Sequence, residues 1–261
     1  MIEVRNADGH VSAATADETA HAGAELARRL DLPHVAWLAR VASTMDEAHA
    51  LAAAGARAGT LVLADTQTQG RGRGGKQWTS RPGAGLWMTL IERPVDASGL
   101  DVLSLRVGLR AAQVLERFAS SAVRLKWPND LMLAEGKLGG ILVEARWREQ
   151  RPEWVAIGIG VNLALPEGVP QAAALGAGAS RDEVLAELVP ALRGAAAARG
   201  ALTPRELQAF AGRDWARDRR VVAPVAGTVA GISSAGAALI ATPQGVVSCT
   251  SGSLVFEGET E

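Results

Sequence analysis

A glycine-rich stretch with three cations is the segment of this sequence whose composition points most directly to chemistry. It reads QGRGRGGKQW over residues 69–78, and its glycines and cations are Gly70, Gly72, Gly74, Gly75, Arg71, Arg73 and Lys76. Glycine lets a backbone approach a bound group closely. Three cations without an acid attract an anion. Because residues 70–75 carry no apolar side chain, we expect all six to stay outside the core, in a loop that binds an anion.

Two familiar glycine motifs overlap this loop only formally. Residues 70–75 have the spacing G-x-G-x-x-G, but a dinucleotide fingerprint needs a helix that opens at its last glycine. A P-loop needs serine or threonine where Gln77 stands. Pro82 and Gly83 follow too soon for a helix, so we expect neither motif. A nucleic-acid-binding Arg-Gly segment, which usually repeats in low-complexity tails, and a solvated surface loop remain as alternatives.

Three further strings place polar side chains beside glycines or at strand ends. KWPND, residues 126–130, combines a lysine, a flat tryptophan and a turn-forming Asn-Asp pair. GKLGGILVE, residues 136–144, sets Lys137 before two glycines at the mouth of an apolar strand, which suits a carboxylate or phosphate. GIGVNL, residues 158–163, ends a strand at Asn162, whose amide could pair with a ligand or close a turn.

Composition limits the class of protein. The chain has 261 residues, is 48% hydrophobic and 21% charged, and carries a formal net charge of −1. A sizeable core is therefore expected, and no global attraction to nucleic acid or membrane. Cys249 is the single cysteine, which excludes an intrachain disulfide and fits a reducing compartment. Residues 1–10 have no signal-peptide core, and no run reaches transmembrane length. We expect a cytoplasmic protein.

Periodicity and capping signals predict the elements that must position these strings. Helices are expected over residues 16–30, from Thr44 to Gly55 or Gly59, and over 99–119, 180–199 and 203–216. A capping box is expected at Thr44 with Glu47, and another at Thr203 with Glu206, where Pro204 takes the first helical position. Strands are expected within the runs 32–41, 59–67, 85–94, 122–130, 131–147 and 153–165, with short turns between them.

Short turns between these strands, such as residues 134–137, favour antiparallel neighbours. The predicted fold class is therefore α+β, with a mixed, mostly antiparallel sheet and helices on one side. After residue 216 short β runs are broken by glycine, proline and serine. We expect a catalytic domain over residues 1–216 and a small all-β domain over residues 217–261.

Taken in order, ST…QGRGRGGKQW…KWPND…GKLGGI…GIGVNL resembles bacterial biotin–protein ligases, also called biotin–[acetyl-CoA-carboxylase] ligases. The resemblance covers about residues 40–165, and more loosely the C-terminal region. It implies a catalytic fold like that of class II aminoacyl-tRNA synthetases, followed by an SH3-like barrel. It also implies two steps. Biotin and ATP give biotinyl-5′-AMP and pyrophosphate, and the adenylate then acylates a lysine of a biotin carboxyl carrier domain.

The resemblance also implies roles for individual residues. Biotin contacts are implied for Ser43, Thr44, Gln67, Gly70, Arg71, Gly72, Arg73, Lys137 and Gly139. Nucleotide contacts are implied for Arg71, Trp78, Lys126, Asn129 and Asn162. The catalytic group would be Arg73 and Lys137, which offset negative charge, and Asp130, which orients or deprotonates the acceptor amine. Mg²⁺ would bridge the phosphates with few protein ligands, since the sequence holds no dedicated metal motif.

The family's chemistry explains why the loop is rich in glycine. An adenylate must be shielded from water until the acceptor arrives, and a loop that is mobile when empty and closes on the ligand does this. The sequence departs from the family pattern at Gly74, where other side chains are common. Family members that repress transcription carry an N-terminal helix-turn-helix of some sixty residues. Only about 40 residues precede Ser43 here, so we expect the type without that domain.

Two alternatives stay open. Lipoate ligases and octanoyl transferases share the implied fold, but octanoyl transferases use a cysteine nucleophile, and Cys249 lies away from the motifs. A nucleic-acid-binding regulator is disfavoured by the net charge. We therefore expect no nucleic acid or membrane partner. A free sheet edge would allow pairing with the carrier domain or with a second copy as a homodimer.

Overall fold

The computed structural model describes residues 16–134, 136–176 and 178–258. The prediction for residues 1–10 lies outside them, as does Glu135 in the expected turn. The helices are α1 (Ala16–Arg29), α2 (Thr44–Ala53), α3 (Leu103–Leu115), α4 (Arg181–Ala197) and α5 (Pro204–Ala211), with short 3-10 helices η1 (Arg73–Gly75) and η2 (Leu100–Val102). The first strands are β1 (Val35–Val41), β2 (Thr60–Gln67), β3 (Gly70–Arg71), β4 (Gln77–Trp78), β5 (Gly85–Glu92), β6 (Val123–Lys126), β7 (Asp130–Leu133), β8 (Gly136–Arg148) and β9 (Arg151–Asn162). The last strands are β10 (Arg220–Ala223), β11 (Gly227–Ile232), β12 (Ala238–Thr242), β13 (Gly245–Cys249) and β14 (Val255–Phe256).

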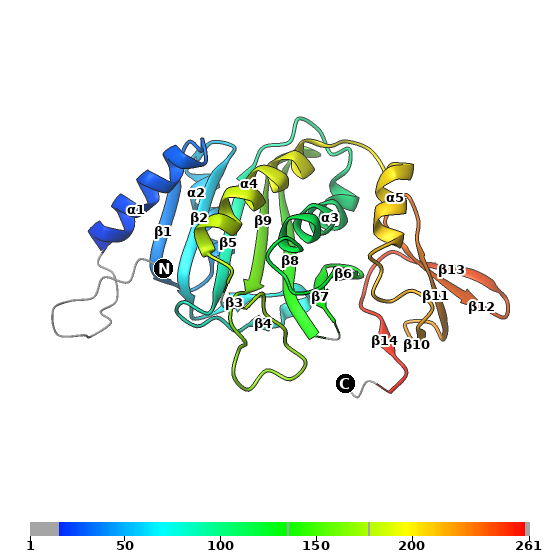
Figure 1. The fold of residues 1–261 in the computed structure, drawn as a ribbon. Helices are drawn as coiled ribbons and strands as arrows, with labels where there is room; N and C mark the ends of the chain where they lie inside the picture. Colours follow the sequence, from blue (N-terminus) through cyan, green and yellow to red (C-terminus); the bar gives the residue numbers. More distant parts are fainter. Residues whose placement is uncertain (1–15, 135, 177, 259–261) are drawn as a thin grey trace.

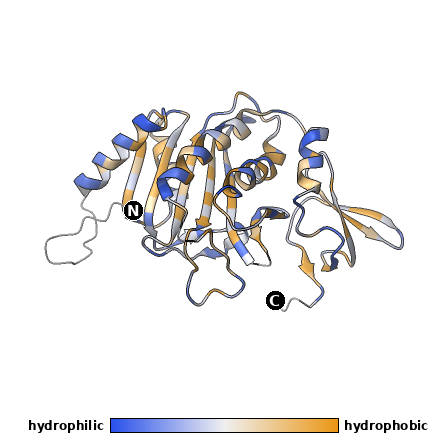
Figure 2. Cartoon of the chain, in the orientation of Figure 1, coloured by the Kyte–Doolittle hydropathy of each residue, from blue (hydrophilic) through white to orange (hydrophobic). Residues whose placement is uncertain are grey.

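A seven-stranded sheet forms the centre of the molecule, in the order β1-β2-β5-β9-β8-β7-β6 (Figure 1). Strands β1 and β2 pair in parallel, because α2 connects them, and the other neighbours in this sheet pair antiparallel. The predicted α+β class with a mixed, mostly antiparallel sheet is therefore confirmed. Apolar residues concentrate in the central strands, whereas α1 shows its hydrophilic residues outward (Figure 2).

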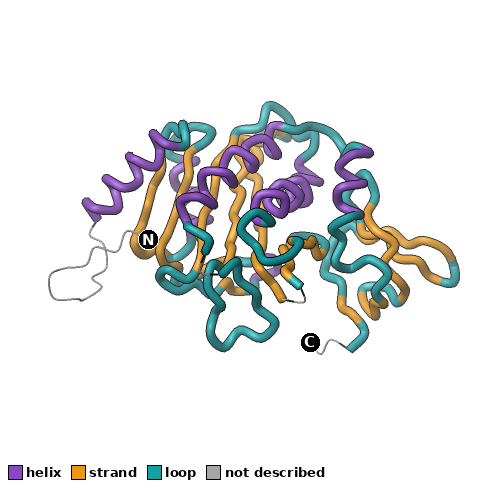
Figure 3. The backbone as a smooth tube through the Cα atoms, in the orientation of Figure 1, coloured by secondary structure: helices purple, strands orange, loops and turns teal. Residues whose placement is uncertain are grey.

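Helices cover both faces of this sheet, so the expectation of helices on one side is wrong. Helices α1, α3 and α4 pack on the face that presents Leu61 and Leu63 of β2. Val62 points the other way and joins a separate apolar cluster with Ala48 and Ala52 of α2. Because side chains alternate along a strand, one strand serves both layers. The tube view shows the helices layered against the strands of this sheet (Figure 3).

The helix ends match the expected signals in part. Thr203 and Glu206 form the predicted capping box at the start of α5, with Pro204 at its first position. In α2 the predicted cap is wrong by one residue: Ser43 is the N-cap, and its hydroxyl accepts from the backbone N–H of Met45. Helices α3 and α5 also end earlier than expected, at Leu115 and Ala211.

The second sheet has five antiparallel strands in the order β13-β12-β11-β10-β14. Its buried side chains, among them Val229 and Ile240, belong to the same hydrophobic cluster as the core of the large sheet. A hydrogen bond also joins the two parts, since the indole N–H of Trp127 donates to the carbonyl of Gly236, between β11 and β12, at 2.9 Å. A division into domains at residue 217 therefore stays a prediction. Of the helices described, none is long and apolar enough to cross a membrane.

Candidate active site

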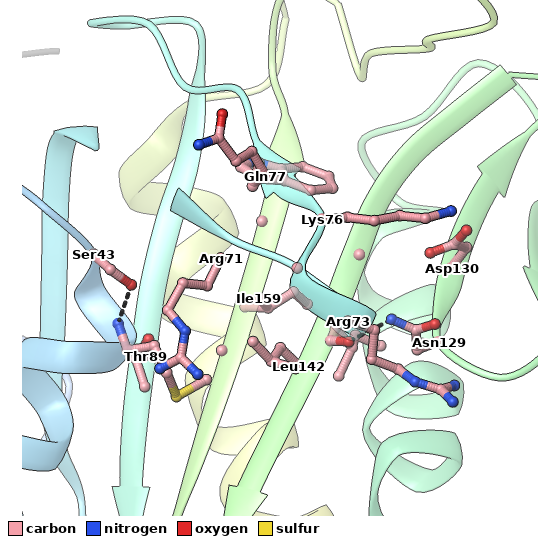
Figure 4. Close-up of a pocket in the computed structure, with 18 of the residues that line it drawn as sticks. Ser43, Arg71, Arg73, Lys76, Gln77, Thr89, Asn129, Asp130, Leu142 and Ile159 are labelled. Atoms are coloured by element: carbon pink, nitrogen blue, oxygen red, sulfur yellow. Dashed lines mark hydrogen bonds between the residues drawn. The ribbon is translucent and has the colours of Figure 1, made fainter. Parts of the chain in front are cut away.

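A cavity of about 330 Å³ opens on the α2 face of the large sheet, under the hairpin of β3 and β4 (Figure 4). Its volume lies in the range typical of small-molecule sites. Most of the predicted site residues line it: Ser43, Thr44, Gln67, Arg71, Gly72, Arg73, Trp78, Asn129, Asp130 and Lys137. These come from four separate strings of the sequence, which the sheet order brings together.

The glycine-rich segment forms a small hairpin rather than a structureless loop. Gly70 pairs with Trp78 across β3 and β4, and Gly74 and Gly75 turn the chain with φ of 65° and 77°. Only glycine adopts such angles without strain. Gly70 itself is buried, and a Cβ there would lie 2.5 Å from the Trp78 carbonyl oxygen. The expectation that all six residues stay outside the core is wrong for Gly70. No helix follows, which agrees with the rejection of both phosphate-loop motifs.

One end of the cavity is a ring of neutral hydrogen-bonding groups. The Gln67 side-chain oxygen accepts from the backbone N–H of Thr44 at 2.8 Å and from its hydroxyl at 3.1 Å. Thr89 of β5 donates to the Thr44 hydroxyl at 2.9 Å. Ser43, Thr44 and Thr89 are buried. Such an end suits a polar but uncharged group, such as a urea or amide. Thr89 was missed, because nothing in an apolar strand sequence marks one threonine as facing a pocket.

The other end of the cavity carries cations that already have partners. Lys137 Nζ lies 2.7 Å from Asp130 Oδ1 and 5.4 Å from the centre of the Trp78 ring. Arg73 donates to the backbone carbonyl of Gly252 at 3.2 Å. Gly252 and Ser253, in the loop between β13 and β14, line the cavity. No signal in the sequence predicted that contribution, because it depends on how the two sheets pack.

Arg71 has two carboxylate partners. Its guanidinium donates to Asp46 at 2.7 Å and to Glu144 at 2.6 Å. Both partners were missed: Asp46 looks like an ordinary first-turn acid of α2, where the helix dipole favours negative charge. Glu144 lies seventy-odd positions from Arg71 along the chain.

Trp78 closes the middle of the cavity against two glycines. A Cβ at Gly160 would lie 2.7 Å from the indole, and one at Gly140 would lie 3.1 Å from it. The Trp78 indole N–H is buried without a hydrogen-bond partner. Leaving such a donor buried and unpaired costs free energy.

Four predicted site residues lie outside the cavity wall: Gly70, Gly139, Lys126 and Asn162. Gly139 of β8 pairs with Val161 of β9, and a Cβ there would come 2.5 Å from the Gly160 carbonyl oxygen. The Lys126 ammonium lies 4.9 Å and 4.7 Å from the ring centres of Trp215 and Phe256. The buried Asn162 amide donates to the carbonyls of Lys137 and Ala173. Direct ligand contacts by these four stay a prediction.

Residues 37–162 match the Biotin/lipoate A/B protein ligase family. This stretch runs from β1 to the end of β9 and holds both ends of the cavity, apart from Gly252 and Ser253. The chain carries a domain of this family.

Individual relatives agree with that assignment. The chain is 40% identical over 131 residues to the "Bifunctional ligase/repressor BirA" of Bacillus subtilis, which covers 50% of this chain and 40% of that protein. It is 41% identical over 146 residues to a biotin–[acetyl-CoA-carboxylase] ligase of Paracoccus denitrificans, across 55% of this chain and 59% of the relative. The chain thus spans about two fifths to three fifths of these relatives' lengths.

A solved structure extends the likeness to most of the fold. The biotin protein ligase of Aquifex aeolicus, in complex with biotin and ATP, superposes with a TM-score of 0.71 and 26% identity. The match covers 85% of this chain and 98% of that one. The likeness therefore reaches beyond the stretch that the family assignment covers.

Proposed function

We propose that this protein is an ATP-dependent biotin–protein ligase. It activates biotin as biotinyl-5′-AMP and transfers biotin to a lysine of a biotin carboxyl carrier domain. The observation that carries the proposal is the cavity itself, where a neutral hydrogen-bonding end meets a cationic end across one continuous space. Biotin presents a matching pair of groups, an uncharged ureido ring and a carboxylate. The relatives' names and the ATP-bound neighbour support the same assignment.

The two ends of the cavity suit the first reaction step. A carboxylate is a poor acyl donor at neutral pH, so one of its oxygens attacks the α-phosphorus of ATP and pyrophosphate leaves. That step brings anions together, and fixed cations offset the repulsion. Ser43, Thr44 and Gln67 would hold the ureido ring. Arg73 and Lys137 would face the carboxyl and α-phosphate oxygens.

In the second step, the lysine amine of the acceptor attacks the acyl carbon and AMP leaves. Asp130 would orient that amine or take its proton, since it lies on the cavity wall beside Lys137. Trp78 and Asn129 would contact the nucleotide. We propose the same for Lys126 and Asn162, and we propose biotin-side backbone contacts for Gly70, Gly72 and Gly139.

Magnesium fits this site as an ion held mainly by the triphosphate. Within the described residues no three carboxylates, histidines or cysteines form a metal cluster. Asp130 is the carboxylate among the described residues that line the cavity. One carboxylate plus substrate phosphates and waters is a usual Mg²⁺ arrangement. The ion would neutralise phosphate charge when bound.

Several finer assignments belong to the same proposal. The large sheet would be of the class II aminoacyl-tRNA synthetase type, and β10–β14 would form an SH3-like barrel as a domain from residue 217. The protein would act in the cytoplasm on a carrier domain of a biotin-dependent carboxylase, alone or as a homodimer. Nucleic acid and membrane are not part of this proposal.

Biotin-dependent exchange between ATP and pyrophosphate tests the proposal directly. The purified protein should incorporate labelled pyrophosphate into ATP when biotin is present. Exchange with lipoate or octanoate, and none with biotin, would assign the chain to the sister activity of the same family. Salt-dependent retention on DNA without any exchange would favour the regulator instead.

A further inference from the structure

The β3 end of the hairpin is tied to two other elements through Arg71. One nitrogen of its guanidinium donates to Asp46 in the first turn of α2, and the other donates to Glu144 in β8. Neither carboxylate belongs to the described residues that line the cavity. The two contacts therefore join the loop to the scaffold around the site. The side chains of Arg71 and Glu144 are 40% and 28% exposed.

Glu144 has a second hydrogen-bond partner, His49, besides Arg71. Its second oxygen lies 2.9 Å from Nε2 of His49, and the indole N–H of Trp154 lies 2.9 Å from Nδ1 of the same ring. An indole nitrogen can only donate, so Nδ1 of His49 accepts, and Nε2–H of His49 donates a hydrogen bond to the Glu144 carboxylate. Trp154 is buried at 6% exposure. The chain Trp154–His49–Glu144 thus fixes the carboxylate before Arg71 meets it.

We propose that Glu144 and Asp46 are positioning residues that anchor the glycine-rich hairpin through Arg71. Four glycines make an ordered hairpin costly in conformational entropy, so a side-chain anchor at one end lowers the cost of keeping it over the cavity. Only an arginine can span two carboxylates with one planar fork. The part of this proposal that concerns retention of the adenylate rests on the proposed function.

The anchor also changes the role of Arg71. One cation between two carboxylates leaves a net charge of −1, which repels a ligand carboxylate or phosphate. Arg71 therefore serves the loop, and Arg73 and Lys137 serve the anionic ligand. This differs from the role that the family resemblance implies for the Arg71 side chain.

Limited trypsin digestion of the ligand-free protein tests the anchor without any reference to catalysis. Cleavage after Arg71, Arg73 and Lys76, mapped by mass spectrometry, should be about threefold to tenfold faster in Glu144→Gln than in the wild type. Glu153→Gln is the matched control, since Glu153 lies on the neighbouring strand and pairs with Arg148 at 3.9 Å. Equal loop cleavage in Glu144→Gln and the wild type would overturn the proposal. If the melting curve shows that Glu144→Gln is unfolded, the same digestion is done with Asp46→Asn, which changes a residue on the surface of α2.

Kinetics of the single and double variants show whether the Arg71 side chain anchors the hairpin or binds the anionic substrate. Arg71→Gln and Glu144→Gln should each speed release of biotinyl-5′-AMP, and Arg71→Gln should do so more because it also loses Asp46. The double variant should match Arg71→Gln, because Glu144 acts through Arg71. In Glu144→Gln the single-turnover rate of adenylate formation should stay within about threefold of the wild-type rate. Arg71→Lys should not restore retention. Additive effects, or a large loss of adenylate formation in Arg71→Gln alone, would show that Arg71 leaves its carboxylates for the ligand. A wild type without biotin-dependent exchange would refute the proposed function and leave the trypsin result standing.

Discussion

Lys137 lies where negative charge would build up during activation, between Asp130 and the ring of Trp78. If Lys137 acts as proposed, Lys137→Ala removes a contact that would be strongest in the transition state, so turnover should fall more than substrate binding weakens. One charge-assisted contact contributes about 1.5–3 kcal/mol. The single-turnover rate of adenylate formation should therefore drop about tenfold to a hundredfold. A rate equal to that of the wild type would place Lys137 outside the chemistry.

Position 160 needs a glycine because the Trp78 ring packs against it, and not because of its backbone angles. In Gly160→Ala the new methyl carbon would stand 2.7 Å from the indole, so the ring must move out of its position over the sheet. Overpacking of this kind costs about 1–3 kcal/mol, and the nucleotide side of the cavity should change shape. Isothermal titration with ATP should show weaker binding. Unchanged ATP affinity and melting temperature would mean that Trp78 does not need Gly160.

Gly194→Ala is the matched control for Gly160→Ala, because it adds the same methyl group to a helix instead of a crowded strand. Gly194 lies in α4, exposed, and a Cβ there would meet no atom within 4 Å. Gly194→Ala should raise the free energy of unfolding by about 0.5–1 kcal/mol, because alanine loses less backbone entropy in a helix. Urea denaturation measures the change. Destabilisation by this substitution would contradict the geometry given for α4.

A buried ion pair connects α3 with the start of α5. Arg106 is 2% exposed, and its guanidinium lies 2.7 Å from Glu206 while also donating to the carbonyls of Gly200 and Ala201. Burial raises the pKa of Glu206, but hydrogen bonds from Arg106 and Thr203 outweigh it and lower the pKa from 4.5 to about 2. Because the folded-state pKa is depressed, its stabilisation is fully present above about pH 4.5.

That stabilisation should be lost as the pH falls from about 4.5 toward 2. The difference in pKa corresponds to about 3 kcal/mol. Urea denaturation at pH 6 and pH 3 should show a larger loss of stability on acidification for the wild type than for Glu206→Gln. The same loss in both proteins would mean that Glu206 does not carry this part of the pH dependence.

The two sheets share one hydrophobic cluster, so the whole molecule should unfold in a single transition. Ile240 is fully buried in the second sheet. Ile240→Ala should lower the free energy of unfolding by about 2–5 kcal/mol. The transition seen by tryptophan fluorescence and the one seen by far-UV circular dichroism should move together. Two separate transitions, with only the weaker one displaced, would instead favour an independent domain from residue 217.

Local signals predicted most of the elements. Thr203, Pro204 and Glu206 predict where α5 begins, because a capping box acts within four residues. Apolar runs predict β2 and β9, whose side chains are buried on both faces. The N-cap of α2 was misplaced since Ser43 and Thr44 are adjacent cap formers. The Thr44 hydroxyl is recruited by Gln67, which lies 23 residues away.

The motifs in the sequence predicted the family resemblance and four of the segments that meet at the cavity, but neither Thr89 nor Gly252 and Ser253. These motifs are short strings, and their chemistry depends on residues that are neighbours in the chain. Other contacts become visible only in the folded chain: Glu144 and Asp46 hold Arg71, Gly252 meets Arg73, and α2 packs on its own face of the sheet. The physical reason is that such contacts follow from strand order and register. A strand places its side chains alternately on two faces, and which face meets which neighbour is settled only when the whole sheet assembles.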